Sequence, residues 1–441
     1  MTRWMARAAW VAACVALPLV PVALLVGTGG QSELDLAVVL GLVGVSAIIG
    51  TVVVGSRLRS LTSGLGIERL IAVHRWLGLV VVGLVLAHVA AVIIPKPSRI
   101  KLLDLLHASP GMRAATIATI ALVLLAVTAL LRRRLRLPYG AWRILHVALA
   151  AVGVAGGAVH VVLENNLIHA AGMRIWFTAI TASLVVVLLL RWVLRPLLAG
   201  RSGFRVLEIR RESDDVSTLV LTPTRGRLFA RRRPLAFAPG QFAWLRLRRW
   251  GLFTDHPFTI ASGTRADGTV EFTVRHLGGY TRNLGRLSPA ARVYLDGPHG
   301  SFSVDHTRAT GLVLLAGGVG ITPMMSMLRT LADRGDRRPH RLLVSGSSPD
   351  DILFINELED LQERLHLTVV PTLTQPHPGW TGTTGRIDAR MLSTVLPGPF
   401  RRNQLDYFLC GSGSFVTGVA GALDEIGIPR QRVHTEQFDM A

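Results

Sequence analysis

Six long apolar stretches in the first 200 residues constrain the fold of this chain more than any other feature. A helix needs about 20 mostly apolar residues to cross the hydrocarbon layer of a membrane, and each stretch reaches or nearly reaches that length. The stretches are residues 10–27, 36–55, 71–94, 114–131, 142–163 and 175–190. The last is the shortest, and residues 192–194 can extend it past Arg191. We therefore expect a six-helix transmembrane bundle in residues 1–200.

The first stretch has a second interpretation. Arg3 and Arg7 precede its Ala, Val and Leu residues, and a short apolar run after positive charges is also typical of a secretory signal. The five later stretches place the chain in a lipid bilayer under either interpretation.

The composition agrees with a membrane protein. Hydrophobic residues make up 50% of the chain and charged residues 17%, which argues against an ordinary soluble protein. The formal net charge of +20 would by itself also suit a nucleic acid partner. However, only five of the 28 Asp and Glu residues precede residue 200. The first half of the chain therefore suits a lipid environment, and the second half suits water. We therefore expect a lipid bilayer around the first half and no nucleic acid partner.

Arginine residues predict which side of the membrane each loop faces, because cytoplasmic loops are enriched in Lys and Arg. Basic clusters follow the second, fourth and sixth stretches, at Arg57, Arg59 and Arg69, at Arg132, Arg133, Arg134 and Arg136, and at Arg191, Arg195 and Arg201. These alternate loops share one side, the cytoplasm. The sequence thus predicts a multi-pass protein of the cell membrane with cytoplasmic N- and C-termini.

Two of the expected spans carry histidines at the same spacing. His74 and His88 lie in the third stretch and His146 and His160 in the fifth, each pair 14 residues apart. Fourteen residues make nearly four helical turns, so both imidazoles of a pair share one face, about 21 Å apart along the axis. The third and fifth helices run parallel because one span lies between them. His74 is therefore expected to face His146 nearer the cytoplasm, and His88 to face His160 nearer the outside.

Imidazoles that face each other across a helix bundle are the ligands that bis-histidine binding of a haem requires. Two such pairs predict two b-type haems, stacked along the membrane normal. A single histidine in a span would more simply satisfy a helix contact or line a proton path, but four at matched spacing favour haem. Imidazole on both axial faces leaves no open iron position, so such haems carry electrons and bind no substrate on iron.

The second half of the chain changes to short alternating strands and then to alternating strands and helices. The first set predicts an antiparallel β-barrel in residues 201–306, with strands at 204–210, 216–222, 241–247, 270–275 and 292–295. The second set predicts an α/β domain with a parallel sheet in residues 307–441, with strands at 311–315, 341–345, 367–372 and 405–409.

Three motifs in this half have binding chemistry. In the expected barrel, a strand ending in His256-Pro257-Phe258-Thr259 offers an aromatic wall and a hydroxyl, and the Gly278-Gly279 turn exposes N–H groups that can hold a phosphate. A plain barrel with glycine turns is the alternative. In the α/β domain, residues 316–323 (AGGVGITP) lie between a strand and a helix that ends near Leu331. Glycines there let a pyrophosphate approach the helix N-terminus, although a tightly packed turn is the alternative.

With these motifs the chain resembles the ferric reductase/NADPH oxidase superfamily, in which a membrane cytochrome b is fused to a ferredoxin-NADP-reductase-like module. The resemblance covers nearly the whole sequence. It rests on the two histidine pairs, on residues 256–259, 296–302 (DGPHGSF), 316–323 and 434–438 (HTEQF), and on Arg75 and residues 139–142.

The resemblance implies a site residue by residue. His256, Pro257, Phe258 and Thr259 would contact the flavin of FAD, and Arg275, Gly278, Tyr280 and Thr281 would serve its phosphates and nearby groups. Gly317, Gly318, Gly320 and Thr322 would cradle the nicotinamide dinucleotide. Cys410 and Gly411 would flank the nicotinamide, and Phe438 would cover the flavin until NAD(P)H displaces it. For Cys410 the alternative is a buried, small apolar residue.

One departure from the family leaves the choice between NADPH and NADH open. The family often has an arginine for the 2′-phosphate of NADPH after the strand expected at 341–345. Here residues 346–351 read GSSPDD, which lacks that arginine and adds acids.

These observations together predict a transmembrane NAD(P)H oxidoreductase. NAD(P)H would give a hydride to FAD at the cytoplasmic face, and the electrons would pass singly through the two haems to an acceptor outside. The acceptor would be oxygen, with superoxide as product, or a ferric chelate. The alternative is an electron relay that reduces a periplasmic or membrane protein partner. Lys96, Arg99, Lys101 and Arg113 of one outer loop form either a surface for an anionic acceptor or a solvated loop.

Overall fold

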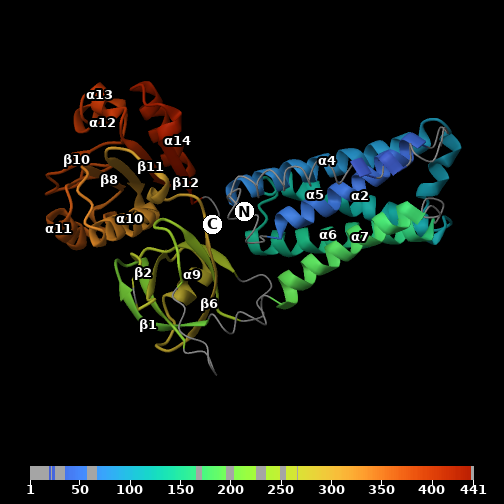
Figure 1. Ribbon diagram of the computed structural model, residues 1–441, viewed down its shortest axis with the longest axis horizontal. Coiled ribbons are helices and arrows are strands. Elements are labelled where there is room, and N and C mark those ends of the chain that lie inside the picture. Colours follow the sequence, from blue (N-terminus) through green and yellow to red (C-terminus); the bar gives the residue numbers. More distant parts are fainter. Residues whose placement is uncertain are drawn as a thin grey trace. The chain divides into compact units, whose positions relative to one another are not determined.

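The computed structural model describes residues 19–20, 22–24, 35–56, 67–164, 171–194, 203–224, 235–248, 255–265 and 267–438. The chain divides into two compact units, Met1–Pro196 and Leu197–Ala441 (Figure 1). The expected domain boundaries at residues 200 and 306 stay predictions.

The first unit contains five helices that are long and apolar enough to cross a membrane, among the residues that the structure describes. They are α2 (Asp35–Gly55), α4 (Ile67–Ile93), α5 (Pro110–Leu130), α6 (Tyr139–Leu163) and α7 (Ala171–Leu189). Helical structure continues past α7 as one π-helical turn, Leu190–Leu194, as the sequence suggested. The first of the six expected helices, residues 10–27, falls mostly outside the described residues. A six-helix bundle is therefore not confirmed.

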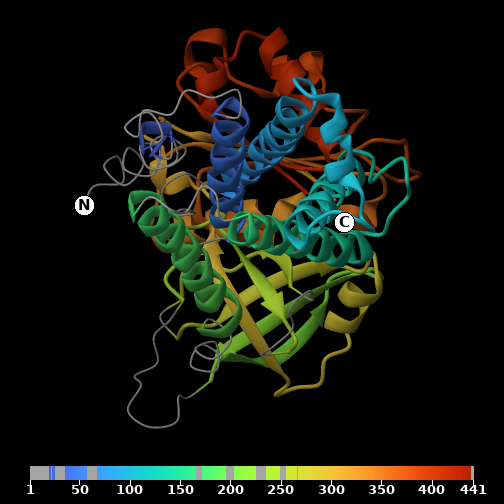
Figure 2. The same ribbon diagram turned by 90° about the vertical axis from the view of Figure 1, so that its right-hand side faces the viewer.

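The helices lie alongside one another, with α2 packed on α4 and α5 packed on α6 (Figures 1 and 2). Glycines of α6 allow the close contact with α5. A Cβ at Gly153 would lie 2.8 Å from the side chain of Leu122, and one at Gly156 would lie 2.9 Å from the carbonyl oxygen of Ala114. Small residues bring helix backbones together in the same way throughout membrane proteins, where packing drives association.

The second unit begins with a curled antiparallel sheet in the order β4-β3-β6-β1-β2-β5. The strands are β1 (Gly203–Arg211), β2 (Val216–Pro223), β3 (Phe242–Arg246), β4 (His256–Thr259), β5 (Val270–Arg275) and β6 (Arg292–His299). The N–H of Ala261, just beyond β4, donates to the oxygen of Glu271 in β5 at 2.8 Å. The edge strands β4 and β5 nevertheless form no ladder among the described residues, so the expected closed barrel is not confirmed.

A parallel sheet follows, in the order β10-β9-β8-β7-β11-β12. Its strands are β7 (Leu312–Gly317), β8 (His340–Gly346), β9 (Leu367–Leu373), β10 (Thr383–Thr384), β11 (Asp406–Gly411) and β12 (Val433–Gln437). Helices α10 (Ile321–Asp333) and α11 (Ile355–Arg364) cover one face, and α12 (Ala389–Val395) and α14 (Gly413–Glu425) cover the other. Strand order reverses between β7 and β11. In open α/β sheets, ligands bind at such a point, beyond the carboxyl ends of the strands.

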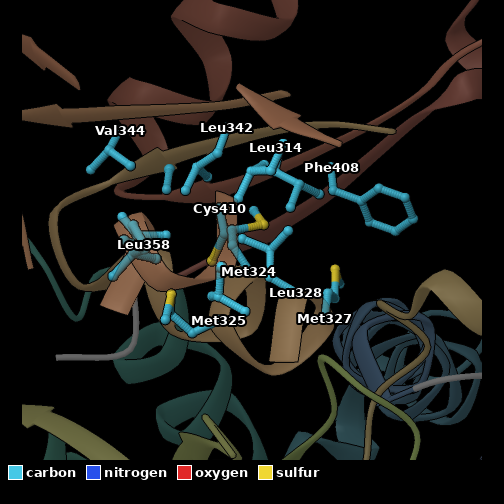
Figure 3. Close-up of a cluster of buried hydrophobic side chains, with 14 of the residues drawn as sticks. Leu314, Met324, Met325, Met327, Leu328, Leu342, Val344, Leu358, Phe408 and Cys410 are labelled. Carbon is cyan, nitrogen blue, oxygen red and sulfur yellow. The ribbon is translucent and has the colours of Figure 1, made fainter. Parts of the chain in front are cut away.

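The core on the first face contains three methionines of α10 and the side chain of Cys410 (Figure 3). Met324 and Leu328 lie under Leu314 of β7 and Cys410 of β11. This packing fixes the start of α10 against the carboxyl ends of the two central strands, which is where the glycine-rich segment lies.

Arg329 of α10 joins the two sheets. Its guanidinium donates to the carbonyl oxygen of Ala261 at 2.7 Å and to Glu271 at 3.1 Å, and it donates twice to Glu357 at 2.6 Å. Burial alone would lower the pKa of Arg329, but the hydrogen bond and charge of Glu357 and the charge of Glu271 raise it. A buried arginine with this many acceptors holds its neighbours in one geometry, so we expect the two sheets to keep a fixed mutual orientation.

Candidate functional site

The structure brings the four histidines of α4 and α6 together in two pairs. The ring centres of His74 and His146 are 6.2 Å apart, and those of His88 and His160 are 6.4 Å apart. A metal–nitrogen bond of about 2 Å on each side, with about 1 Å from each nitrogen to its ring centre, gives about 6 Å between the ring centres of two axial imidazoles. Both pairs therefore fit the ligands of a six-coordinate haem iron.

Hydrogen bonds orient three of these imidazoles. Nδ1 donates to a backbone carbonyl oxygen in His74 (Thr51, 3.1 Å), in His88 (Ala37, 2.6 Å) and in His160 (Gly111, 3.2 Å). A carbonyl oxygen can only accept, so the proton is on Nδ1 and the lone pair on Nε2, the nitrogen that is left for a metal.

The fourth imidazole, of His146, has a different environment. Its Nδ1 is buried and has no hydrogen-bond partner among the described residues. Its ring instead lies 5.1 Å from that of Trp142, one helical turn earlier on α6, and the guanidinium of Arg132 lies 5.6 Å from the Trp142 ring. The two pairs thus differ in how their ligands are held.

Helix α2 contains a third 14-residue spacing that sequence reasoning missed. A Cβ at Gly41 would lie 3.0 Å from Nδ1 of His88, and a Cβ at Gly55 would lie 3.2 Å from Nδ1 of His74. These two glycines are 14 residues apart, as are the acceptor residues Ala37 and Thr51. The spacing therefore repeats that of the histidines on the neighbouring helix. The glycine spacing was a signal in the sequence, although its meaning depends on α2 packing against α4.

On the flavin side, residues 256–259 form strand β4, which ends at Thr259 as the sequence predicted. Pro257 is tolerated because β4 is an edge strand, where a missing N–H breaks no inner ladder. The ring of Tyr280 stacks on His256 with ring centres 4.2 Å apart and lies parallel to Phe258 at 6.4 Å. Its hydroxyl donates to the oxygen of Leu245, and burial raises its pKa. Thr259 is buried.

The predicted phosphate-binding residues have partners within the protein. Gly278 precedes the short helix α9 (Gly279–Leu284), and its N–H donates to Oγ1 of Thr281 at 2.9 Å. Arg275 is paired with Asp215 at 3.1 Å and with Asp351 at 2.5 Å. A phosphate would therefore have to compete for Arg275 and for the Gly278 N–H, which the sequence did not indicate.

The glycine-rich turn between β7 and α10 is packed against β11. A Cβ at Gly320 would lie 2.3 Å from the carbonyl oxygen of Cys410, and one at Gly317 would lie 2.9 Å from the ring of Phe415. Gly318 has φ +55°, a conformation that favours glycine, and its Cβ position is 3.6 Å from Nη1 of Arg275. The side chain of Arg275 thus reaches the turn from the other sheet.

Two other residues of the dinucleotide prediction are nearby. Thr322, in the first turn of α10, is buried and donates its hydroxyl to the oxygen of Val319 at 3.0 Å. Gly411 ends β11, and its oxygen accepts from the N–H of Phe438 at 3.0 Å. The structure therefore gathers the glycine turn, Gly411 and the partly buried Phe438 beyond the carboxyl ends of β7 and β11.

Cys410 is fully buried in the core drawn in Figure 3. Burial, and then the nearby charge of Glu436, raise the pKa of its thiol well above the usual value, so the thiol is neutral. Its burial agrees with the alternative of a small apolar residue, and its role beside the nicotinamide stays a prediction. Glu436, which pairs with Cys410 in the β11–β12 ladder, lies in the HTEQF motif but was not singled out as a site residue.

Asp351 is a second residue that sequence reasoning did not place in the site. Its carboxylate accepts from the N–H groups of Ser347 and Ser348 at 3.1 and 3.2 Å and pairs with Arg275. Burial alone would raise its pKa, but hydrogen bonds from Ser347 and Arg275 lower it to about 2. The ionised carboxylate therefore lies at the carboxyl end of β8.

Three families match successive parts of the chain. Residues 40–157 match a ferric reductase like transmembrane component, residues 227–303 an FAD-binding domain, and residues 314–421 an oxidoreductase NAD-binding domain. The first match contains all of the predicted haem ligands except His160, and the second contains all of the residues predicted to bind FAD except Phe438.

Two curated relatives of this chain are reductases by name. The glycine betaine monooxygenase reductase subunit of Pseudomonas aeruginosa is 29% identical over 245 residues, 54% of this chain and 64% of that protein, so the chain spans less than two thirds of that relative. Ferredoxin–NADP reductase B of Sorangium cellulosum is 29% identical over 53% of this chain and 96% of that protein. Among solved structures, the FAD/NAD-binding domain of nitric oxide dioxygenase from Vibrio cholerae is 22% identical, with a TM-score of 0.47 over 54% of this chain and 98% of that chain.

Proposed function

Since the chain has the domain architecture of the ferric reductase/NOX-like flavocytochromes, we propose that it is a transmembrane NAD(P)H oxidoreductase. It carries electrons from cytoplasmic NAD(P)H through FAD and two b-type haems to an acceptor on the other side of the membrane. The observation that supports this most is the pair of imidazole–imidazole distances, 6.2 and 6.4 Å, in a chain that also has flavin and nicotinamide domains. Both termini lie in the cytoplasm in this proposal.

Each part of the chain has a defined role in this proposal. His74 and His146 hold the inner haem, and His88 and His160 hold the outer one. When bound, FAD accepts a hydride and releases its electrons singly, and each haem carries one electron. With two histidines assigned to each haem, the haems would carry electrons and bind no substrate, so the chain would conduct electrons to an acceptor at the outer end of the bundle.

Residues of the second unit bind and orient the two nucleotides. Strand β4 and Tyr280 provide the aromatic wall for the flavin, and Arg275, Gly278 and Thr281 serve its phosphates. The turn Gly317–Gly320 with Thr322 receives the dinucleotide at the reversal of strand order. Cys410 and Gly411 flank the nicotinamide, and Phe438 covers the flavin until the nicotinamide arrives. The Cys410 thiol is buried and neutral, so it adds no charge near the reacting ring.

The proposed acceptor is a small molecule, oxygen or a ferric chelate, and the test is an acceptor comparison. Purified protein loaded with haem and FAD is given NAD(P)H with oxygen, with ferric citrate or with neither, and superoxide dismutase is the probe for superoxide. Dismutase-sensitive turnover at full rate supports an oxidase, and turnover with ferric citrate alone supports a ferric reductase. The absence of turnover with either acceptor supports the relay to a protein partner. Loaded protein without low-spin b-type bands would contradict the whole proposal.

We expect NADH to be the better donor, because of Asp351. Dinucleotide folds often recognise the ribose 2′-hydroxyl at the carboxyl end of the second parallel strand, which here is β8. With a pKa of about 2, the Asp351 carboxylate is ionised at neutral pH and repels a 2′-phosphate. Asp351→Ser should raise the ratio of kcat/KM for NADPH over NADH about tenfold, or about 1.4 kcal/mol.

Steady-state flavin reduction with each donor measures that ratio. Asp350→Ser is the matched control, because it removes the same charge one residue away and leaves the carboxylate that Ser347, Ser348 and Arg275 hold. An unchanged ratio in Asp351→Ser, with both variants folded and loaded with FAD, would show that this carboxylate does not select the donor.

A further inference from the structure

The start of α5 lies beside the end of α6, near His160. The side chains there form an arrangement that the proposed electron path does not use. Nδ1 of His160 donates to the oxygen of Gly111, in the first turn of α5, at 3.2 Å. This hydrogen bond orients the ligand, so whatever positions the backbone at Gly111 also positions the imidazole of His160.

Glu164 and Ser109 hold that backbone. Glu164 follows the last residue of α6, and its N–H donates to the oxygen of His160 at 3.0 Å, which places it one turn beyond the ligand. Ser109 caps α5: its hydroxyl donates to Oε1 of Glu164 at 2.8 Å and accepts from the N–H of Met112 at 3.3 Å. The carboxylate thus links the end of α6 to the start of α5.

Gly111 lets the carboxylate lie directly on this turn. A Cβ at residue 111 would be 2.5 Å from Oε1 of Glu164, which is closer than real contacts allow. The carboxylate, the Gly111 backbone and the His160 ring therefore form one continuous chain of contacts. The other histidine of α6 has no equivalent link, because Nδ1 of His146 has no hydrogen-bond partner among the described residues.

The charge of Glu164 has an electrical consequence. A carboxylate is unfavourable at the C-terminus of α6 and favourable at the N-terminus of α5, so its stabilising partner is the α5 end with Ser109. Glu164 is half-buried, and one of only five acids before residue 200. A negative charge near an iron ligand favours the ferric over the ferrous state and lowers the reduction potential, and a membrane boundary screens it less than bulk water does.

We propose that Glu164, together with Ser109, is a positioning residue for the outer haem: it fixes the Gly111 carbonyl that orients His160, and its charge lowers the potential of that haem. The inference rests on the proposed function, since it requires a haem between His88 and His160. The two haems would then differ in ligand orientation and reduction potential because of the residues around them.

The test uses potentiometric titration and low-temperature electron paramagnetic resonance of the full-length protein in lipid nanodiscs. The signal that is lost in His88→Leu identifies the outer haem. Glu164→Gln keeps the shape and hydrogen-bonding capacity and removes the charge, so it should shift the reduction equilibrium of the outer haem toward ferrous at least about threefold, or about 30 mV. The inner haem should not change.

Glu164→Ala and Ser109→Ala remove the link as well, so they should also change the low-spin g values of the outer haem, which report ligand orientation. Asp104→Asn is the matched control, because it removes an acid in the adjoining loop whose carboxylate pairs with His107 instead. Unchanged outer-haem potential and g values in all three Ser109 and Glu164 variants, with both haems present, would overturn the inference. Wild-type protein without two low-spin haems would instead overturn the proposed function.

Discussion

Replacing His88 with leucine is expected to abolish electron delivery to the outer acceptor, by at least about a hundredfold, while NAD(P)H still reduces the flavin. Leucine has no lone pair, so the outer iron would keep one ligand of two. Electron transfer by this chain then stops at the inner pair, His74 and His146, because the ring pair at 6.4 Å is the one that is broken. The expected signature is normal flavin bleaching, a reducible inner haem and lost turnover.

Stopped-flow absorbance separates these events, and a pyridine haemochrome assay gives the haem content of each variant. His107→Leu is the matched control, because His107 is an exposed histidine of the adjoining loop whose ring pairs with Asp104. It should keep both haems and full turnover. Normal acceptor reduction by His88→Leu with normal haem content would refute the assignment of the outer haem. His74→Leu should block reduction of both haems and still allow flavin reduction.

Replacing Gly320 with valine is expected to lower NAD(P)H-dependent flavin reduction by at least about a hundredfold. The first added carbon would lie 2.3 Å from the oxygen of Cys410 and 2.8 Å from the nitrogen of Gly411, and both are backbone atoms that cannot rotate away. Either the start of α10 or the end of β11 must move, and both border the proposed nicotinamide site. Overpacking of this kind typically costs about 1–3 kcal/mol of stability, so the domain should still fold.

Dithionite distinguishes this defect from general damage, because it supplies electrons without the nicotinamide site. In Gly320→Val, dithionite should still reduce flavin and haems, while NADH and NADPH should not. Gly418→Ala in α14 is the control, since its Cβ would meet nothing within 4 Å, and it should be neutral or slightly stabilising. A normal rate of flavin reduction by NADH in Gly320→Val would show that the turn does not bind the dinucleotide.

Elements with strong local patterns were predicted well. The apolar runs anticipated α2, α4, α5, α6 and α7 to within a few residues. Most strands of both sheets were anticipated likewise, but β10 and β12 were not. The parallel direction of the strands in the second sheet followed from the alternation of strands and helices. Each of these depends on the chemistry of neighbouring residues, which a single sequence contains.

Features that depend on how strands meet in space were predicted less well. A closed barrel is not confirmed, because closure requires β4 and β5 to form a ladder, and strand spacing does not encode that pairing. Arg275 was expected to be available to a phosphate, yet Asp215 and Asp351, 60 and 76 residues away along the chain, already pair with it.

The histidine pairs show which features the sequence determined and which features depended on the fold. Helical geometry alone places residues 14 apart on one face, so the four imidazoles and their pairing across α4 and α6 were visible in the linear pattern. Their hydrogen-bond acceptors were not, because Thr51, Ala37 and Gly111 lie 23, 51 and 49 residues from the rings that they orient. Those contacts exist only once α2 packs on α4 and α5 on α6, since packing between helices depends on the shapes of whole side-chain surfaces. The carboxylate of Glu164 beside Gly111 is of the same kind: its residue type is local, and its neighbour is supplied by the fold.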